Sequence, residues 1–238
     1  MPGKNLWRDS IRPRIAVSQA TLGILNAGDL IRQSGGTRCQ DGIALSLFET
    51  PLCIVIPSFE VRQANGDNCQ EETQILVLDY LTRSVGTTPP ENVNAGRRWL
   101  GFQELPNGAF YAAAFRSYTS AVLERELSGG IADFQQACEG NGGRPFSLGD
   151  AAFSFRALPH IDLGIVWWAG DDEFPATATV LFDRSAAHAL PIDGLAALGR
   201  LLCQGLIRAA RTLVPVEHRT MEPASETLGR SGHVEDPC

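Results

Sequence analysis

A histidine and two aspartates stand at the ends of two consecutive apolar segments. His160 and Asp162 lie at the start of the first segment, IDLGIVWWA, and Asp183 follows the second, ATATVLF. If the acidic turn GDDEFP folds these segments into an antiparallel hairpin, Asp162 lies opposite Asp183 and His160 shares their face. An imidazole and two carboxylates could bind a divalent metal ion or transfer a proton in a small metal-dependent enzyme. The alternative is that Asp183 caps the turn after it and that Asp162 is solvated.

The turn between the two segments carries three further acids, Asp171, Asp172 and Glu173. Hard cations such as Ca²⁺ and Mg²⁺ prefer several oxygen ligands, so a cation site is one interpretation. The spacing of an EF-hand loop is absent, however, and acids are common in turns. We therefore expect a structural or solvent-facing role for these three side chains.

Aromatic residues in and before the hairpin could form the wall of a pocket. Trp167 and Trp168 are adjacent in an expected strand, so their side chains point to opposite faces and only one suits a one-sided core. We expect five of six aromatic residues to pack in the core, the six being Trp99, Phe102, Phe110, Tyr111, Trp167 and Trp168. The exposed tryptophan, which we take as Trp168, would form an apolar wall with Trp99. Such a wall suits a planar macrocycle, whose carboxylates Arg98 could bind.

His188 lies just before the last expected helix. It could be an axial ligand to haem iron or to the cobalt of a corrinoid, or it could be an ordinary polar residue near a helix start. The candidate cofactors are therefore a corrinoid or haem for the aromatic wall, and a divalent metal for the histidine–aspartate cluster.

Composition and the absence of common motifs argue against several classes of protein. The net charge is −7, which argues against a nucleic-acid partner because phosphate binding needs clustered Lys and Arg. We find no P-loop, nucleophile elbow or H-E-x-x-H pattern. No transmembrane segment and no secretory signal is seen, so we expect a cytoplasmic protein. The six cysteines form no C-x-x-C pair and are expected to be free buried thiols.

Hydrophobic periodicity predicts the elements that must position these residues. Helices are expected over 10–34, 71–85, 110–127, 131–139 and 192–213. Strands are expected over 43–48, 52–56, 59–62, 99–103 and 150–158, and in the hairpin over 161–182. Asn68 is expected to cap the helix over 71–85, and residues 87–96 to form a loop.

These elements predict an α+β fold, with an antiparallel sheet and helices packed on one face. We expect a single domain with an irregular C-terminal tail. The expected parts are an N-terminal helical extension (1–38), an α+β core domain (39–213) and a flexible tail (214–238).

Several motifs of the chain resemble one family, catalogued as domain of unknown function 3786. The resemblance is carried by FQELPNG at 102–108, Gly142-Gly143, WAGDDEFPA at 168–176 and LFD at 181–183. Gln103, Asn107 and Asp172 depart from the residues usual in that family, which are Arg, Gly and Glu. The resemblance covers roughly Cys39 to Leu206.

The resemblance implies an accessory role around a tetrapyrrole cofactor, but it carries over no catalytic residue. The expected function is therefore an accessory binding protein for a corrinoid or haem, or for a corrinoid or iron–sulfur partner protein. Two alternatives stay open. One is a small metal-dependent enzyme that uses His160, Asp162 and Asp183. The other is a non-catalytic subunit that docks onto a larger complex through its exposed tryptophan and its tail.

Overall fold

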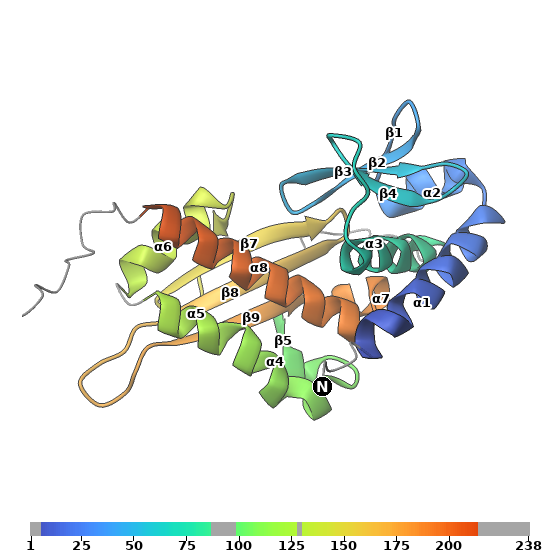
Figure 1. Ribbon diagram of the computed structural model, residues 1–238. Coiled ribbons are helices and arrows are strands. Elements are labelled where there is room, and N and C mark those ends of the chain that lie inside the picture. Colours follow the sequence, from blue (N-terminus) through green and yellow to red (C-terminus); the bar gives the residue numbers. More distant parts are fainter. Residues whose placement is uncertain (1–5, 87–98, 128–129, 214–238) are drawn as a thin grey trace, which may run out of the picture.

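The computed structural model describes residues 6–86, 99–127 and 130–213 (Figure 1). Arg98, the expected loop over 87–96 and the expected tail over 214–238 lie outside these residues. The helices are α1 (Leu6–Gly23), α2 (Ala27–Ser34), α3 (Glu71–Ser84), α4 (Ala112–Tyr118), α5 (Ser120–Glu126), α6 (Ile131–Gly140), α7 (Ala186–Ala189) and α8 (Ile192–Leu213). None of the described helices combines the length and apolar composition needed to cross a membrane.

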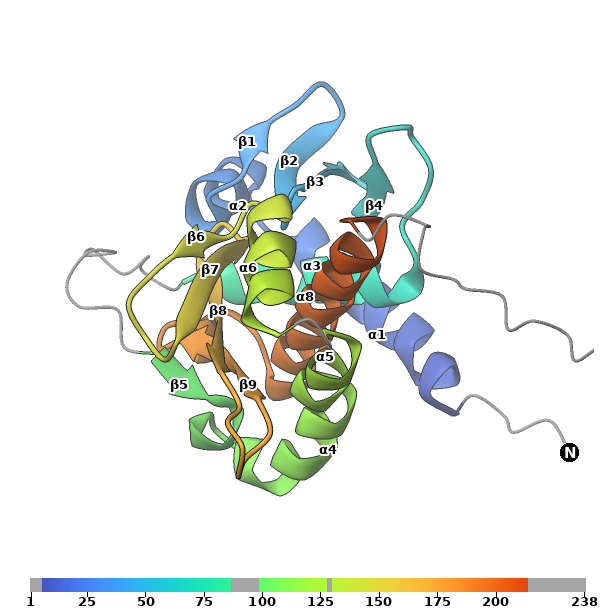
Figure 2. The ribbon, with the colours of Figure 1, turned by 90° about the vertical axis from the view of Figure 1, so that its left-hand side faces the viewer.

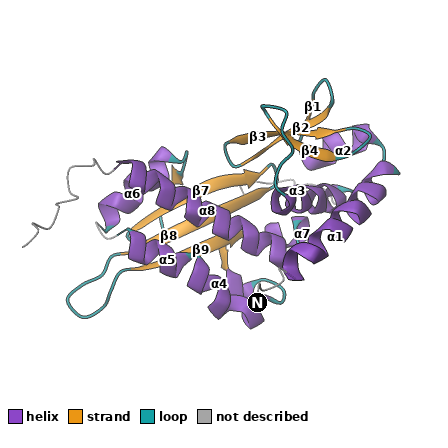
Figure 3. Ribbon diagram, in the orientation of Figure 1, coloured by secondary structure: helices purple, strands orange, loops and turns teal. Residues whose placement is uncertain are grey.

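The strands form two antiparallel sheets (Figure 3). The first has the order β1-β2-β3-β4, with β1 (Thr37–Arg38), β2 (Gly42–Leu47), β3 (Thr50–Val55) and β4 (Glu60–Gln63). The second has the order β5-β9-β8-β7-β6, with β5 (Trp99–Gly101), β6 (Arg144–Pro145), β7 (Ala151–Leu158), β8 (Ile161–Trp168) and β9 (Thr177–Asp183). The α+β class expected from the sequence is therefore confirmed.

One face of the five-stranded sheet packs against helices, as Figure 2 shows for α4, α5, α6 and α8. Strand alternation determines which side chains of the sheet pack against these helices. Phe153, Phe155 and Ala157 of β7 point toward these helices and are buried, as their spacing predicts. Trp167 is 1% exposed on this face and stacks on Phe134 of α6.

The opposite face of the same sheet carries a second, smaller apolar group. Ala152, Val166 and Leu181 are buried there, and Trp99 and Phe146 pack against them. Trp168 also alternates to this side and is 39% exposed. The prediction that the adjacent tryptophans face opposite ways is thus confirmed.

The two sheets share one core. A single cluster of buried residues runs from Ile11 of α1 through Ile43 of the first sheet to Leu206 of α8. A backbone hydrogen bond also joins the sheets, because the N–H of Phe48 donates to the carbonyl of Ala157 over 2.8 Å. The N-terminal helices take part in this core, since α1 packs along α3 and Leu22 and Leu30 are fully buried.

The hairpin register that the sequence predicts is confirmed. Leu163 pairs with Phe182 and Trp168 pairs with Thr177, so Asp162 and Asp183 continue the same register at the end of the ladder. The strands β2, β3 and β4 also lie where they were expected. Pro51 belongs to β3, outside its pairing with β4, which begins at Leu52.

Three details of the helices differ from expectation. The helix expected over 10–34 is two helices, because α1 ends at Gly23 and the side chain of Asn26 caps α2 by accepting from the N–H of Gly28 over 2.8 Å. The helix expected over 110–127 breaks at Thr119. Asn68 does not cap α3, since it forms an isolated bridge with Arg62, and Gln70 stands at the cap position without a side-chain hydrogen bond.

Candidate functional site

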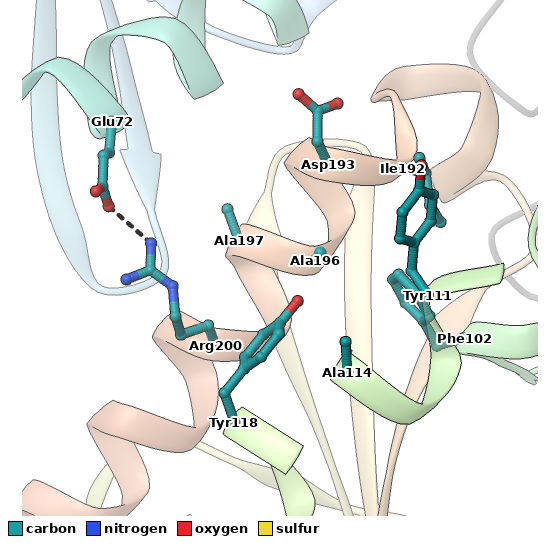
Figure 4. Close-up of a pocket in the computed structure, with 10 residues that line it drawn as sticks. All are labelled: Glu72, Phe102, Tyr111, Ala114, Tyr118, Ile192, Asp193, Ala196, Ala197 and Arg200. Carbon is teal, nitrogen blue, oxygen red and sulfur yellow. Dashed lines mark hydrogen bonds and ion pairs between the residues drawn. The ribbon is translucent and has the colours of Figure 1, made fainter. Parts of the chain in front are cut away.

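A pocket of about 560 Å³ opens between α3, α4 and α8 (Figure 4). One side is lined by Tyr111, which ends a 3-10 turn (Gly108–Tyr111), and by Ala114 and Tyr118 of α4. The α8 side carries Ile192, Asp193, Ala196, Ala197 and Arg200, which follow one face. Phe102 and Glu72 complete the described lining.

Next to the pocket, the helical segment breaks at Thr119. The backbone there has φ −120° and ψ −100°, and the Thr119 hydroxyl donates to the carbonyl of Phe115 over 2.5 Å. Such bonds back to residue i−4 compete with the regular helix and bend it. The helix that follows the break, α5, packs on α8 and on β9. Alanine side chains on α8 leave the space of the pocket open.

Aromatic rings form most of the apolar wall. Tyr111 is 59% exposed and Tyr118 is 41% exposed, and Figure 4 shows their rings on either side of Ala114. Phe102 is buried and stacks on Phe115 with a centroid distance of 4.0 Å. This stack holds Phe102 in place, so the wall of the pocket is rigid on that side.

Charged side chains stand at the rim. Arg200 donates from Nη2 to the carboxylate of Glu72 over 2.7 Å, and both side chains are about one-third exposed. Asp193 accepts from Arg14 of α1 over 3.0 Å. Burial raises the pKa of the Tyr118 phenol, and the nearby Arg200 opposes that rise. Tyr118 therefore keeps its proton at neutral pH and can donate a hydrogen bond.

The arrangement is that of a small-molecule pocket. Such pockets commonly have volumes of roughly 300–1,000 Å³ and combine apolar walls with a few polar groups that fix orientation. Here the two phenols and the guanidinium of Arg200 supply the polar groups. One N–H of Arg200 is engaged by Glu72, so its remaining donors can bind an acidic group of a ligand.

The sequence did not identify the two tyrosines of the pocket, Tyr111 and Tyr118, as pocket residues. Tyr111 was counted among the core aromatics, and Tyr118 was given no role beyond its place in the helix expected over 110–127. Phe110, also counted among the core aromatics, is 86% exposed, so the expectation that five of the six aromatics are buried is wrong. The spacing of Tyr111, Ala114 and Tyr118 is the signal that could have identified a second, solvent-facing stripe. Arg200 carries no comparable signal.

The structure places Trp99 and Trp168 on the face of the five-stranded sheet that is opposite to this pocket. Trp99 stacks on Phe146 with a centroid distance of 5.1 Å and lies over Gly164. Leu148 and two serines join it in a shallow cavity of about 350 Å³, which Trp168 does not line. The expected aromatic wall from Trp99 and Trp168 stays a prediction, and Arg98 lies outside the described residues.

The three residues of the expected metal cluster have other partners in the structure. Asp162 pairs with Arg156 over 2.5 Å, and the carboxylate of Asp183 accepts from the N–H and hydroxyl of Ser185 over 2.9 and 2.6 Å. His160 turns away from them, with Nε2 at 3.0 Å from the carbonyl oxygen of Gln33. The described residues contain no group of three metal-ligating side chains. The metal site is therefore still a prediction.

His188 lies in the last turn of α7 and is exposed, and it does not line the pocket. Its proposed role as an axial ligand is likewise still a prediction. Of the three acids in the β8–β9 turn, Asp171 has a structural role, and Asp172 and Glu173 are exposed. One oxygen of Asp171 accepts from the N–H groups of Glu173 and Phe174 over 2.9 and 2.8 Å, and these bonds lower the pKa of that carboxyl.

Comparison with protein-family models gives a match over residues 26–205, to a model described as Domain of unknown function (DUF3786). The match begins 13 residues before Cys39, where the motif resemblance was expected to start, and so includes α2. No curated protein and no solved structure matches the chain.

Proposed function

Because this chain belongs to the DUF3786 family, whose description names no activity, we propose a function from the pocket itself. The protein is an accessory binding protein that holds a planar, largely apolar ligand with an acidic group between α4 and α8. The observation that carries this proposal is the lining of the pocket. The rings of Phe102, Tyr111 and Tyr118 line the pocket together with alanines of α4 and α8. Arg200 stands at the rim, with one of its N–H groups bound to Glu72.

We propose a tetrapyrrole as the ligand class. The apolar faces of the macrocycle suit the rings of Tyr111 and Tyr118, and its carboxylates suit the free donors of Arg200. The described lining contains no histidine, cysteine or methionine, so those usual axial ligands do not come from this pocket. The ring would therefore be held by stacking and by ion pairing. In this pocket Tyr111 and Tyr118 form the aromatic wall that the sequence assigned to Trp99 and Trp168.

Binding would be measured by titrating the purified protein with haemin and, separately, with a cobalamin, and by following the visible absorption spectrum. The Arg200→Gln variant should bind roughly 10- to 100-fold more weakly, because a charge-assisted hydrogen bond is lost. The matched control is Arg208→Gln. It removes an exposed arginine two turns along the same helix, outside this pocket, and should leave the affinity unchanged.

A second pair of variants tests the space between the helices. Ala196→Leu fills the pocket and should abolish binding, whereas Gln204→Leu adds the same side chain at an exposed position of α8 and should not. Circular dichroism confirms that each variant is folded. Equal affinity in all four variants would exclude this pocket as the site, and no spectral change with either compound would exclude the tetrapyrrole class.

The same proposal places the protein in the cytoplasm, with a corrinoid or iron–sulfur protein as its partner. All five described cysteines are free, which supports a reducing compartment. The partner would be sought by adding the candidate protein to the ligand-loaded chain and following transfer of the chromophore.

A further inference from the structure

Two cysteine side chains meet on the outer face of the four-stranded sheet. Cys39 follows β1 and Cys53 belongs to β3, 14 positions later in the chain. Their Sγ atoms lie 3.3 Å apart, and both residues are half-buried. The five described cysteines are free, as expected, but Cys39 and Cys53 are only half-buried.

The topology of the sheet brings the two thiols together. The N–H of Cys39 donates to the carbonyl of Gly42 over 3.0 Å and thereby closes the turn from β1 into β2. In the β2–β3 ladder Ala44 pairs with Cys53, so the small side chain of Ala44 leaves room above it. The neighbours of Cys53 in β3, Leu52 and Ile54, alternate into the core, and the thiol of Cys53 therefore points outward.

We propose that Cys39 and Cys53 form a reversible disulfide, which makes this edge of the protein a thiol–disulfide site. The two sulfurs need to approach by about 1.3 Å to reach the bond length of about 2.05 Å. Among the described residues, no group of three side chains could hold a metal ion. A dithiol is therefore favoured over a metal site.

The oxidant is a low-molecular-weight disulfide such as oxidised glutathione. The Cys39 thiolate attacks one of its sulfurs, which forms a mixed disulfide and releases one small thiol. The Cys53 sulfur, on losing its proton, then attacks the Cys39 sulfur and releases the second small thiol. Two protein thiols are oxidised and one disulfide is reduced to two thiols, so protons and electrons balance.

The surroundings of Cys53 suit it to the second step. Burial raises the pKa of the Cys53 thiol, and its hydrogen bond with Cys39 acts in the same direction. Cys53 thus stays protonated at neutral pH. As the resolving group, Cys53 is held next to the mixed disulfide, so its low thiolate fraction is offset by proximity.

The other described cysteines do not share this geometry. Cys69, Cys138 and Cys203 are buried, and burial raises the pKa of each thiol. Oxidants reach exposed thiolates first, so these three should resist oxidation. They serve as internal controls within the same chain.

The test uses the full chain, reduced and then incubated with oxidised glutathione. Of the six cysteines, two should lose reactivity toward a thiol reagent under denaturing conditions, and the mass should fall by about 2 Da. Peptide mapping without reductant should recover the Cys39 and Cys53 peptides joined, and dithiothreitol should separate them. Cys39→Ser and Cys53→Ser should each abolish the cross-link, whereas Cys69→Ser should retain it.

A second readout is thermal unfolding. The oxidised chain should unfold at a higher temperature than the reduced chain, because the cross-link restricts the unfolded state, and Cys39→Ser should show no such difference. A stable glutathione adduct on either residue, a cross-link to any other cysteine, or six unchanged thiols would each overturn the proposal. None of these outcomes bears on the ligand pocket, which lies between other elements.

Discussion

At the scale of single residues, Tyr80 connects three segments that are far apart in the sequence. Its ring is fully buried in α3, and its hydroxyl donates to the carbonyl of Ser34 at the end of α2 over 2.6 Å. The ring of His160, in the β7–β8 turn, lies 6.4 Å from it between centroids. Burial raises the pKa of the Tyr80 phenol, so this donor stays protonated across the physiological range.

We expect Tyr80→Phe to lower the free energy of unfolding by about 1–2 kcal/mol, because the buried carbonyl of Ser34 loses its donor. Urea denaturation measures the change. Tyr111→Phe is the control, since Tyr111 is mostly exposed, and it should change stability by less than about 0.5 kcal/mol. Equal effects of the two substitutions would show that the Tyr80 hydroxyl does not stabilise the fold.

Asp79 should make stability depend on pH. Burial raises the pKa of its carboxyl above 3.8, and Arg14, which donates to it over 2.8 Å, opposes the rise, while the neighbouring Asp193 adds to it. The folded chain therefore holds this proton more tightly than the unfolded chain. The contribution of Asp79 to the free energy of unfolding consequently falls as pH rises from 3.8 through the raised pKa.

We expect Asp79→Asn to lose this part of the pH dependence, because the amide does not titrate. Urea denaturation of both proteins at a series of pH values from 3.8 upward measures the two slopes. If the difference in stability between wild type and variant is constant over that series, the pKa of Asp79 is the same in the folded and unfolded chains.

At the scale of elements, the small residues of α8 determine how closely α4 can pack against it. A Cβ atom on Gly199 would lie 2.6 Å from the ring of Phe115, which is closer than real contacts allow. The glycine therefore lets Phe115, in the middle of α4, dock against α8. One turn earlier, Ala196 and Ala197 face open space, so the pocket begins where this close contact ends.

We expect Gly199→Ala to lower the free energy of unfolding by about 1–3 kcal/mol, because Phe115 must move out of a packed aromatic cluster. Gly205→Ala, in the same helix, is the control. Its Cβ would meet only Asn141 Oδ1 at 3.4 Å, and alanine should stabilise the helix by up to about 1 kcal/mol. Thermal or urea denaturation measures the stability of both variants. If Gly199→Ala changes stability no more unfavourably than Gly205→Ala, the close packing at Gly199 is contradicted.

At the scale of the whole molecule, one continuous core lies beneath both sheets. Ile43 and Ile54 of the small sheet belong to the same buried cluster as Leu163 of the large sheet and Leu198 of α8. The Phe48–Ala157 hydrogen bond crosses between the sheets. Elements that share a core usually unfold together.

We expect a single cooperative unfolding transition. Three of the four tryptophans, Trp99, Trp167 and Trp168, lie in the large sheet, so tryptophan fluorescence reports mainly on that sheet. Native-state hydrogen exchange at the amides of β2 and β3 reports on the small sheet. The two measurements should give the same free energy of unfolding. A clearly lower value for β2 and β3 would show that the small sheet opens as a separate unit.

The sequence alone determined most of the longer elements and the register of the hairpin, because strand alternation and turn residues act locally. Phe153, Phe155 and Ala157 had to share one face, and Trp167 and Trp168 had to face opposite ways. The α+β class follows from the order of those elements, and the family follows from motifs such as WAGDDEFPA.

Only the tertiary structure decided which side chains meet. The helical segment over 110–127 breaks at Thr119, and Tyr118 beside the break is 41% exposed, although its spacing also suits a core stripe. The pairing of Cys39 with Cys53, and of Arg200 with Glu72, joins residues whose separation along the chain carries no periodic signal. Periodicity reports the face of an element, but contacts between elements depend on how those elements pack, and packing is a property of the whole chain.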